Sequence, residues 1–229
     1  EDPMLRLDWN EARRRLNVQL MGPIQLEVLT NLAKERFDLE VTFGTGSIIY
    51  KETIATGAMA AAAGGFTSVC PMPNTKPSTD TPEKITALLE KAKQDAKIHI
   101  LPIGAISIGQ EGKMLADIKG MAAAGAVAFS EDGKSVMNSA LYAEGLKLAA
   151  EVGVPVFAHC EDIDLVRGGV MNAGKRAEEL GLPGITNAVE DIITARDIFL
   201  ARETGVQLHL CHCSTKDSVK MIAMAKAEG

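Results

Sequence analysis

The chain has 229 residues, of which 46% are hydrophobic, 24% charged and 4% aromatic. Its 24 basic and 30 acidic residues give a formal net charge of −6, which argues against a nucleic-acid-binding surface. No apolar run reaches the roughly 18 residues of a membrane span, and the charged N-terminus does not read as a signal peptide. Four cysteines without a CxxC pair favour a reducing, cytoplasmic setting, in which we expect them to be small buried residues.

Residues 1–36 carry no chemical signature and stay unassigned, although EARRRLNVQL within them is compatible with a helix. From residue 50 onward, short apolar runs alternate with amphipathic segments. We expect strands at 66–72, 98–106, 125–130, 154–159 and 206–212, with one more at 39–43. We expect helices at about 51–63, 82–94, 113–124, 139–152, 187–203 and 216–228.

This alternation is typical of a parallel sheet built from βαβ units. Thr81 followed by Pro82 predicts a helix start, and Gly153 and Gly205 each stand where a helix ends before a strand. Six βα units are counted by residue 229. The pattern leaves two architectures open: an open doubly wound sheet, or a (β/α)8 barrel without its last two units.

Chemistry-bearing side chains follow three of the predicted strands. Asp132 comes after 125–130, His159 ends 154–159, and His212 ends 206–212. Since parallel strands present their carboxyl ends at one rim, these residues are candidate ligands of a zinc-like ion, although single structural histidines are common. The residues alone leave these two interpretations evenly balanced.

Other polar residues have competing interpretations. Asn74 is either a turn residue or an amide presented to a substrate. The pairs Glu131/Asp132 and Glu161/Asp162 are also compatible with solvated loops. His209 is expected to face the helices and, like His99, to be structural. No nucleophile elbow, phosphate loop or dinucleotide fingerprint is present.

Several segments closely resemble bacterial dihydroorotase of the class I type, in the amidohydrolase superfamily. They are YKETIATGAMAAAAGGFTSVCPMPNTKP (50–77), AFSEDG (128–133), AHCED (158–162), AVEDIITARDIFLARETG (188–205) and HLCHCSTKDSV (209–219). The resemblance extends over about residues 37–229. It implies a partial metal-dependent hydrolase domain there, a TIM barrel of about six βα units.

The resemblance also implies an activity and a site. Dihydroorotases interconvert N-carbamoyl-L-aspartate and L-dihydroorotate in pyrimidine biosynthesis, using one or two zinc ions. Asp132, His159 and His212 match metal ligands of the family, and Asn74 matches a residue that contacts the substrate's carboxylate. The partners implied are the small-molecule substrate and a second copy of the chain or an aspartate transcarbamoylase.

Two departures from the family pattern bear on activity. The family's His-x-His-x-Arg stretch aligns with Glu40, Thr42 and Gly44, and its general-base aspartate lies on a strand beyond residue 229. No catalytic residue is therefore identified within the chain, and we expect little or no turnover from this polypeptide. We interpret it as a dihydroorotase fragment with a divergent or misread N-terminus. The alternatives are a non-catalytic subunit that scaffolds the transcarbamoylase, and another cyclic amidohydrolase of the hydantoinase or allantoinase type.

Overall fold

The structure is a computed structural model that describes residues 6–10, 15–19, 30–31, 33–35, 38 and 53–229. The chain divides into two compact units, Glu1–Lys51 and Glu52–Gly229, and each is described by itself. The expected strand at 39–43 lies outside the described residues. The proposed division of the chain at residues 36 and 37 stays an expectation for the same reason.

In the first unit, β1 (Arg6–Asn10) pairs antiparallel with β2 (Arg15–Gln19), so that Arg6 lies opposite Gln19. The helix with which EARRRLNVQL is compatible is therefore not formed by residues 15–19, which are a strand. The sequence RLNVQ alternates polar and apolar residues, which is the two-residue period of a strand rather than the 3.6-residue period of a helix.

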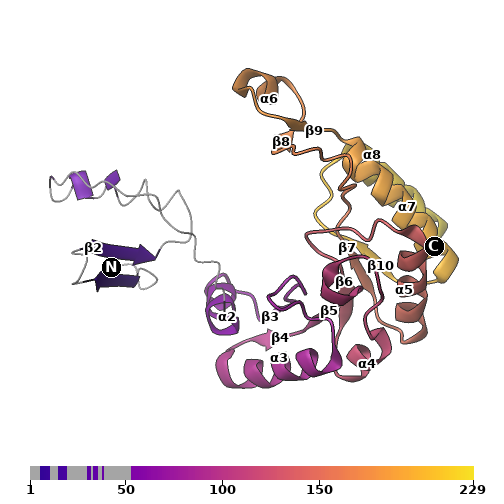
Figure 1. The fold of residues 1–229 in the computed structure, drawn as a ribbon, viewed down its shortest axis with the longest axis horizontal. Coiled ribbons are helices and arrows are strands. Elements are labelled where there is room, and N and C mark those ends of the chain that lie inside the picture. The colour runs from indigo at the N-terminus through magenta and orange to yellow at the C-terminus, as the bar shows by residue number, and fades with distance from the viewer. Residues whose placement is uncertain (1–5, 11–14, 20–29, 32, 36–37, 39–52) are drawn as a thin grey trace. The chain divides into compact units, whose positions relative to one another are not determined.

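The second unit contains a parallel sheet whose strand order follows the chain. Its four strands are β5 (Ile103–Ala105), β6 (Ala128–Ser130), β7 (Val156–Ala158) and β10 (Leu208–Leu210), in the spatial order β10-β7-β6-β5. A doubly wound sheet reverses its strand order at a switch point, whereas a barrel adds each new strand beside the last. The observed order therefore supports the barrel architecture, and the strands follow an arc (Figure 1).

The predicted strand 98–106 is interrupted at Pro102. Its first part, β4 (His99–Ile100), pairs parallel with β3 (Ser68–Val69), and its second part is β5. The N–H groups of Leu101 and Ile103 still donate to carbonyls of the β3 segment, at 2.9 and 3.4 Å. Pro102 has no N–H to give, so the ladder is broken there, but the segment continues beside β3.

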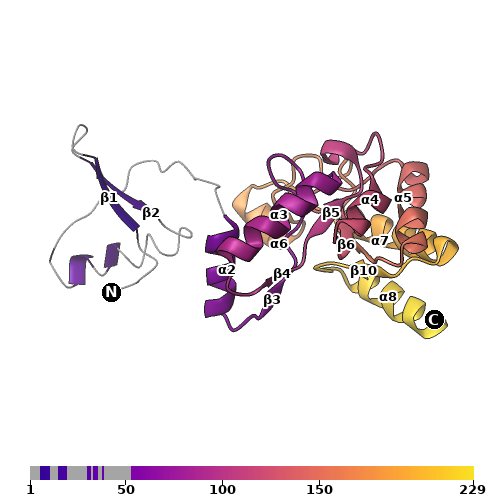
Figure 2. The ribbon, with the colours of Figure 1, turned by 90° about the horizontal axis from the view of Figure 1, so that it is seen from below.

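The six predicted helices are all present, with ends shifted by a few residues. Thr81 caps its helix by accepting a hydrogen bond from the Lys84 N–H, and Gly205 ends another with a φ of +72°. Figures 1 and 2 show these helices packed along the strands. They are α2 (Ile54–Ala63), α3 (Pro82–Asp95), α4 (Ile118–Ala123), α5 (Ser139–Glu151), α7 (Ala188–Thr204) and α8 (Lys216–Glu228).

The main core lies between the sheet and the helices. Phe129 of β6 is fully buried and packs in one cluster with Met121 of α4, Leu146 of α5 and Val156 of β7. A Cβ at Gly104 would lie 2.9 Å from the Phe129 ring, so only glycine fits there. Each such side chain contributes roughly 1.5–3 kcal/mol through burial, and together they fix β5, β6 and β7 side by side.

One excursion was not predicted. Between β7 and α7 the chain forms β8 (Met171–Asn172), α6 (Lys175–Leu180) and β9 (Gly184–Ile185), with β8 and β9 parallel. Its strands have two residues each, too few to give a periodic hydrophobic signal. The excursion extends away from the sheet (Figure 1).

Two smaller findings complete the fold. Among the described residues, no helix combines the length and apolar character needed to cross a membrane. All four cysteines are free, but only Cys160 is buried; Cys70 is exposed, and Cys211 and Cys213 are half-buried. The expectation of four buried cysteines is thus wrong for three of them.

Candidate metal centre

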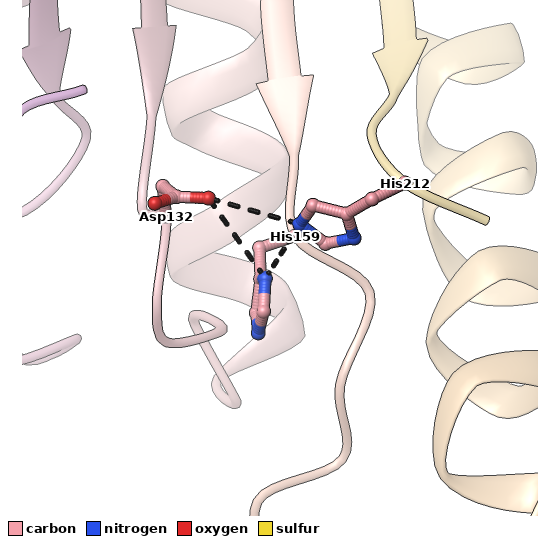
Figure 3. Close-up of side chains that lie close together, drawn as sticks. All are labelled: Asp132, His159 and His212. Carbon is pink, nitrogen blue, oxygen red and sulfur yellow. Dashed lines mark hydrogen bonds and ion pairs between the residues drawn. The ribbon is translucent and has the colours of Figure 1, made fainter. Parts of the chain in front are cut away.

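Three side chains converge at the carboxyl ends of neighbouring strands. Asp132 lies two residues after β6, His159 directly after β7, and His212 two residues after β10. His159 Nδ1 lies 3.0 Å from His212 Nε2, and Asp132 Oδ1 lies 3.9 and 3.8 Å from these two nitrogens. Figure 3 shows the three side chains pointing toward one another from three strand ends. The structure thus brings together the three residues singled out in the sequence.

This donor set fits a divalent metal ion. Zinc takes nitrogen and oxygen ligands at about 2.0–2.2 Å, which in a tetrahedron places neighbouring ligand atoms about 3.4 Å apart. The observed separations of 3.0, 3.8 and 3.9 Å lie on both sides of that value. The His212 side chain is 57% exposed, whereas those of His159 and Asp132 are 20% exposed. A ligand can therefore reach the cluster from solvent.

A second layer of polar groups orients two of the candidate ligands. The Glu161 carboxylate lies 3.1 Å from His159 Nε2, which leaves Nδ1 to face the centre. Asn74 Nδ2 donates to Asp132 Oδ2 at 2.8 Å, which leaves Oδ1 to face the centre. Carboxylate partners of this kind fix the tautomer and ring orientation of metal-binding histidines. The sequence left the pair Glu161/Asp162 compatible with a solvated loop, so the contact of Glu161 with His159 was not predicted.

The loop that carries Asp132 is anchored to the neighbouring strand. Glu131, only 4% exposed, accepts hydrogen bonds at 3.1 Å from the N–H groups of Ile106 and Ser107, and another from the Ser107 hydroxyl. Burial raises the pKa of Glu131 despite these donors. Gln110 Nε2 donates to the Asp132 carbonyl at 3.3 Å. The interpretation of Glu131 as a solvated loop residue is therefore wrong.

His209 differs from expectation in its orientation, and His212 lies beyond the end of β10. His209 was expected to face the helices, but its neighbours Leu208 and Leu210 pack on the helix side. His209 therefore points to the opposite face, where its ring lies 4.9 Å from Phe157. The strand ends at Leu210, and His212 has a φ of +36°, so the two-residue alternation cannot be extended to it. His99 is exposed and lies outside the cluster.

Comparisons with known proteins agree with this picture. The family described as Dihydro-orotase-like matches residues 32–218. Proteins named dihydroorotase from Staphylococcus epidermidis and Ligilactobacillus salivarius are 47% and 46% identical over 180 and 189 residues. The matched regions cover 79% and 82% of this chain but only 42% and 44% of those proteins. The chain thus spans less than half the length of the curated relatives it matches.

Solved structures of cyclic amide hydrolases share the fold. The L-hydantoinase from Arthrobacter aurescens superposes with a TM-score of 0.60 at 26% identity, covering 77% of this chain and 41% of that one. The D-hydantoinase from Thermus sp. gives a TM-score of 0.58 at 26% identity, covering 82% and 42%. These are related enzymes at lower identity than the dihydroorotases. With a matched region of well over half its residues, the chain belongs to the dihydro-orotase-like family.

Proposed function

We propose that this chain carries the metal centre of a dihydroorotase, the metal-dependent cyclic amidohydrolase that interconverts N-carbamoyl-L-aspartate and L-dihydroorotate in pyrimidine biosynthesis. The observation that carries the proposal is the convergence of Asp132, His159 and His212 from the ends of three neighbouring strands. The 46–47% identity to proteins named dihydroorotase supports this substrate over the hydantoins, whose enzymes are 26% identical. We expect the metal to be zinc, bound as one or two ions.

Each residue has a distinct part in the proposed chemistry. A bound divalent ion supplies Lewis-acid polarisation of a carbonyl oxygen and a more acidic water. Asp132 contributes a negative charge to the ion, and His159 and His212 contribute neutral nitrogen donors. Glu161 accepts a hydrogen bond from the Nε2–H of His159 and so keeps the Nδ1 lone pair directed to the centre.

Asn74 is proposed to contact the substrate's carboxylate. It is exposed, follows β3, and its amide nitrogen reaches the Asp132 carboxylate at 2.8 Å. A substrate at the centre would therefore lie within reach of the same amide. A cytoplasmic location, and a second copy or an aspartate transcarbamoylase as partner, are further parts of the proposal that the family resemblance supports.

The metal site is tested by zinc titration of the 229-residue chain against a chromogenic chelator. We expect one strong site that is lost in His159→Ala and in His212→Ala. His209 lies in β10 and its ring contacts Phe157, so His209→Ala is the matched control. This variant should bind zinc as the unsubstituted chain does. Equal zinc affinity in all three variants would contradict the ligand assignment.

The substrate class is tested by calorimetry on the zinc-loaded chain. Dihydroorotate or carbamoyl aspartate should bind more tightly than unsubstituted hydantoin, because only the former carry a carboxylate for Asn74. Asn74→Ala should remove this preference. Stronger binding of hydantoin would instead favour the hydantoinase type, and zinc binding without affinity for either ligand would favour the scaffold subunit.

A further inference from the structure

Glu190 ties the loop after β10 to the first turn of α7. Its two carboxylate oxygens lie 3.0 and 2.9 Å from the Ser214 N–H. The oxygen Oε1 also accepts from the Thr215 N–H at 3.0 Å and from the Thr215 hydroxyl at 3.1 Å. One side chain thus binds three consecutive donors of a loop that lies 24–25 residues further along the chain.

This loop begins at His212, whose backbone is in an unusual conformation. Its φ of +36° lies in the left-handed region, which costs a non-glycine residue about 1–2 kcal/mol. Such a conformation persists only where the surrounding structure determines it. The Ser214 hydroxyl donates to the His212 carbonyl at 3.3 Å, so the residue that Glu190 binds also contacts the His212 backbone.

The hydrogen bonds to Glu190 are of the strong, charge-assisted kind. Burial acts to raise the pKa of Glu190, but the N–H groups of Thr215 and Ser214 outweigh it and lower the pKa. The carboxylate is therefore ionised at neutral pH, and each N–H donates to a charged acceptor. Asp191 also binds the start of α8, through the Ser218 hydroxyl and through the Thr215 hydroxyl, whose single proton it shares with Glu190.

We propose that Glu190 is a positioning residue that holds His212 in its metal-facing orientation. Without it, the backbone at His212 would relax toward the extended region, and the imidazole would leave its place 3.0 Å from His159. The proposal rests on the metal site proposed above, because it assigns Glu190 to one of that site's three ligands. Glu190 itself contacts neither the metal position nor the substrate.

A double-mutant cycle on the 229-residue chain tests this, with zinc affinity measured by chelator competition. We expect Glu190→Ala to weaken zinc binding by about 10- to 100-fold, the range typical for residues that orient a metal ligand. Glu190→Gln, which keeps one carbonyl acceptor, should lose less. His212→Ala removes the strong site and leaves only the weak binding that Asp132 and His159 can provide. Adding Glu190→Ala to that chain should change this weak affinity by less than about 3-fold, because the residue acts through His212. Glu203→Ala, an exposed residue of the same helix, is the matched control and should be silent.

The outcomes separate the two proposals. If the unsubstituted chain binds no zinc, the metal site itself is wrong and the role of Glu190 falls with it. If the chain binds zinc but Glu190→Ala binds it equally well, only the role of Glu190 is wrong. An equal loss with and without His212 would show that Glu190 acts on the whole fold, which also overturns the proposal. Should Glu190→Ala fail to fold, the same comparison is made with Glu190→Gln.

Discussion

The buried carboxylate of Asp197 tests whether desolvation or an ion pair has the larger effect on a charge in the protein interior. Asp197 of α7 is 1% exposed, and one of its oxygens lies 2.8 Å from both Nε and a terminal nitrogen of Arg196. Its other oxygen lies 3.9 Å from the thiol of Cys160, the residue after His159. Burial raises the pKa of Asp197 from 3.8 to about 6, although Arg196 acts to lower it. Desolvation therefore outweighs the ion pair.

The raised pKa fixes the sign of a pH effect. Between about pH 4 and pH 6 the folded state holds a proton on Asp197 that the unfolded state has released. The contribution of Asp197 to the free energy of unfolding therefore falls as pH rises through this window, and the loss is complete above the folded pKa. A rise from 3.8 to about 6 corresponds to about 3 kcal/mol.

Asp197→Asn should remove this pH dependence. Asparagine has the shape of a protonated aspartate and stays neutral, so the variant should match the unsubstituted chain near pH 4. By pH 7 it should be more stable than the unsubstituted chain by up to about 3 kcal/mol. The measurement is urea unfolding at half-unit pH steps, with the exposed Asp164→Asn as the matched control.

The opposite result would refute the reasoning. If the Arg196 ion pair dominated, removing the carboxylate would leave the Arg196 guanidinium, on a side chain that is 16% exposed, without its charged partner. Breaking a buried pair in this way typically costs about 3–5 kcal/mol. A variant that is several kcal/mol less stable at pH 7 would show that the pairing, not the desolvation, is the larger effect.

Two further predictions concern the metal centre. The Ser135 hydroxyl donates to the His159 carbonyl at 2.7 Å and accepts from the Glu161 N–H at 3.2 Å. Ser135→Ala should therefore lower the free energy of unfolding by about 1–3 kcal/mol and weaken zinc binding. Urea unfolding and zinc titration measure the two effects, and the exposed control Ser139→Ala should change neither quantity. Zinc at about 100 times its dissociation constant should stabilise the chain by about 2.7 kcal/mol, seen as a rise in Tm that a chelator reverses; an unchanged Tm would mean that no site of that affinity forms.

The parts of the structure that could be predicted are those set by periodicity. Apolar spacing predicts six of the seven α-helices of the second unit, all except α6, and the rule that parallel strands present their carboxyl ends at one rim predicts the meeting of Asp132, His159 and His212. The strand order separates the barrel from a doubly wound sheet, and no local pattern could do so. The orientation of His209 was misjudged because the two-residue period was carried through to His212, beyond the end of the strand.

The contacts that hold the ligands in place were not predicted, for a physical reason, although Asn74 itself was singled out as a substrate contact. Asn74, after β3, binds the carboxylate of Asp132, which follows β6. Ser135, in the loop after β6, binds the His159 carbonyl and the Glu161 N–H, both in the backbone that follows the His159 side chain after β7.

Glu190, in the first turn of α7, binds the loop that begins at His212, after β10. Each ligand is thus anchored by a residue that stands earlier in the chain, on another βα unit. Such an arrangement depends on how the units pack, so a local sequence pattern does not reveal it. It also means that a substitution in one βα unit should disturb the metal ligand of a later unit more than the ligand of its own unit. The Glu190 and Ser135 variants measure this behaviour.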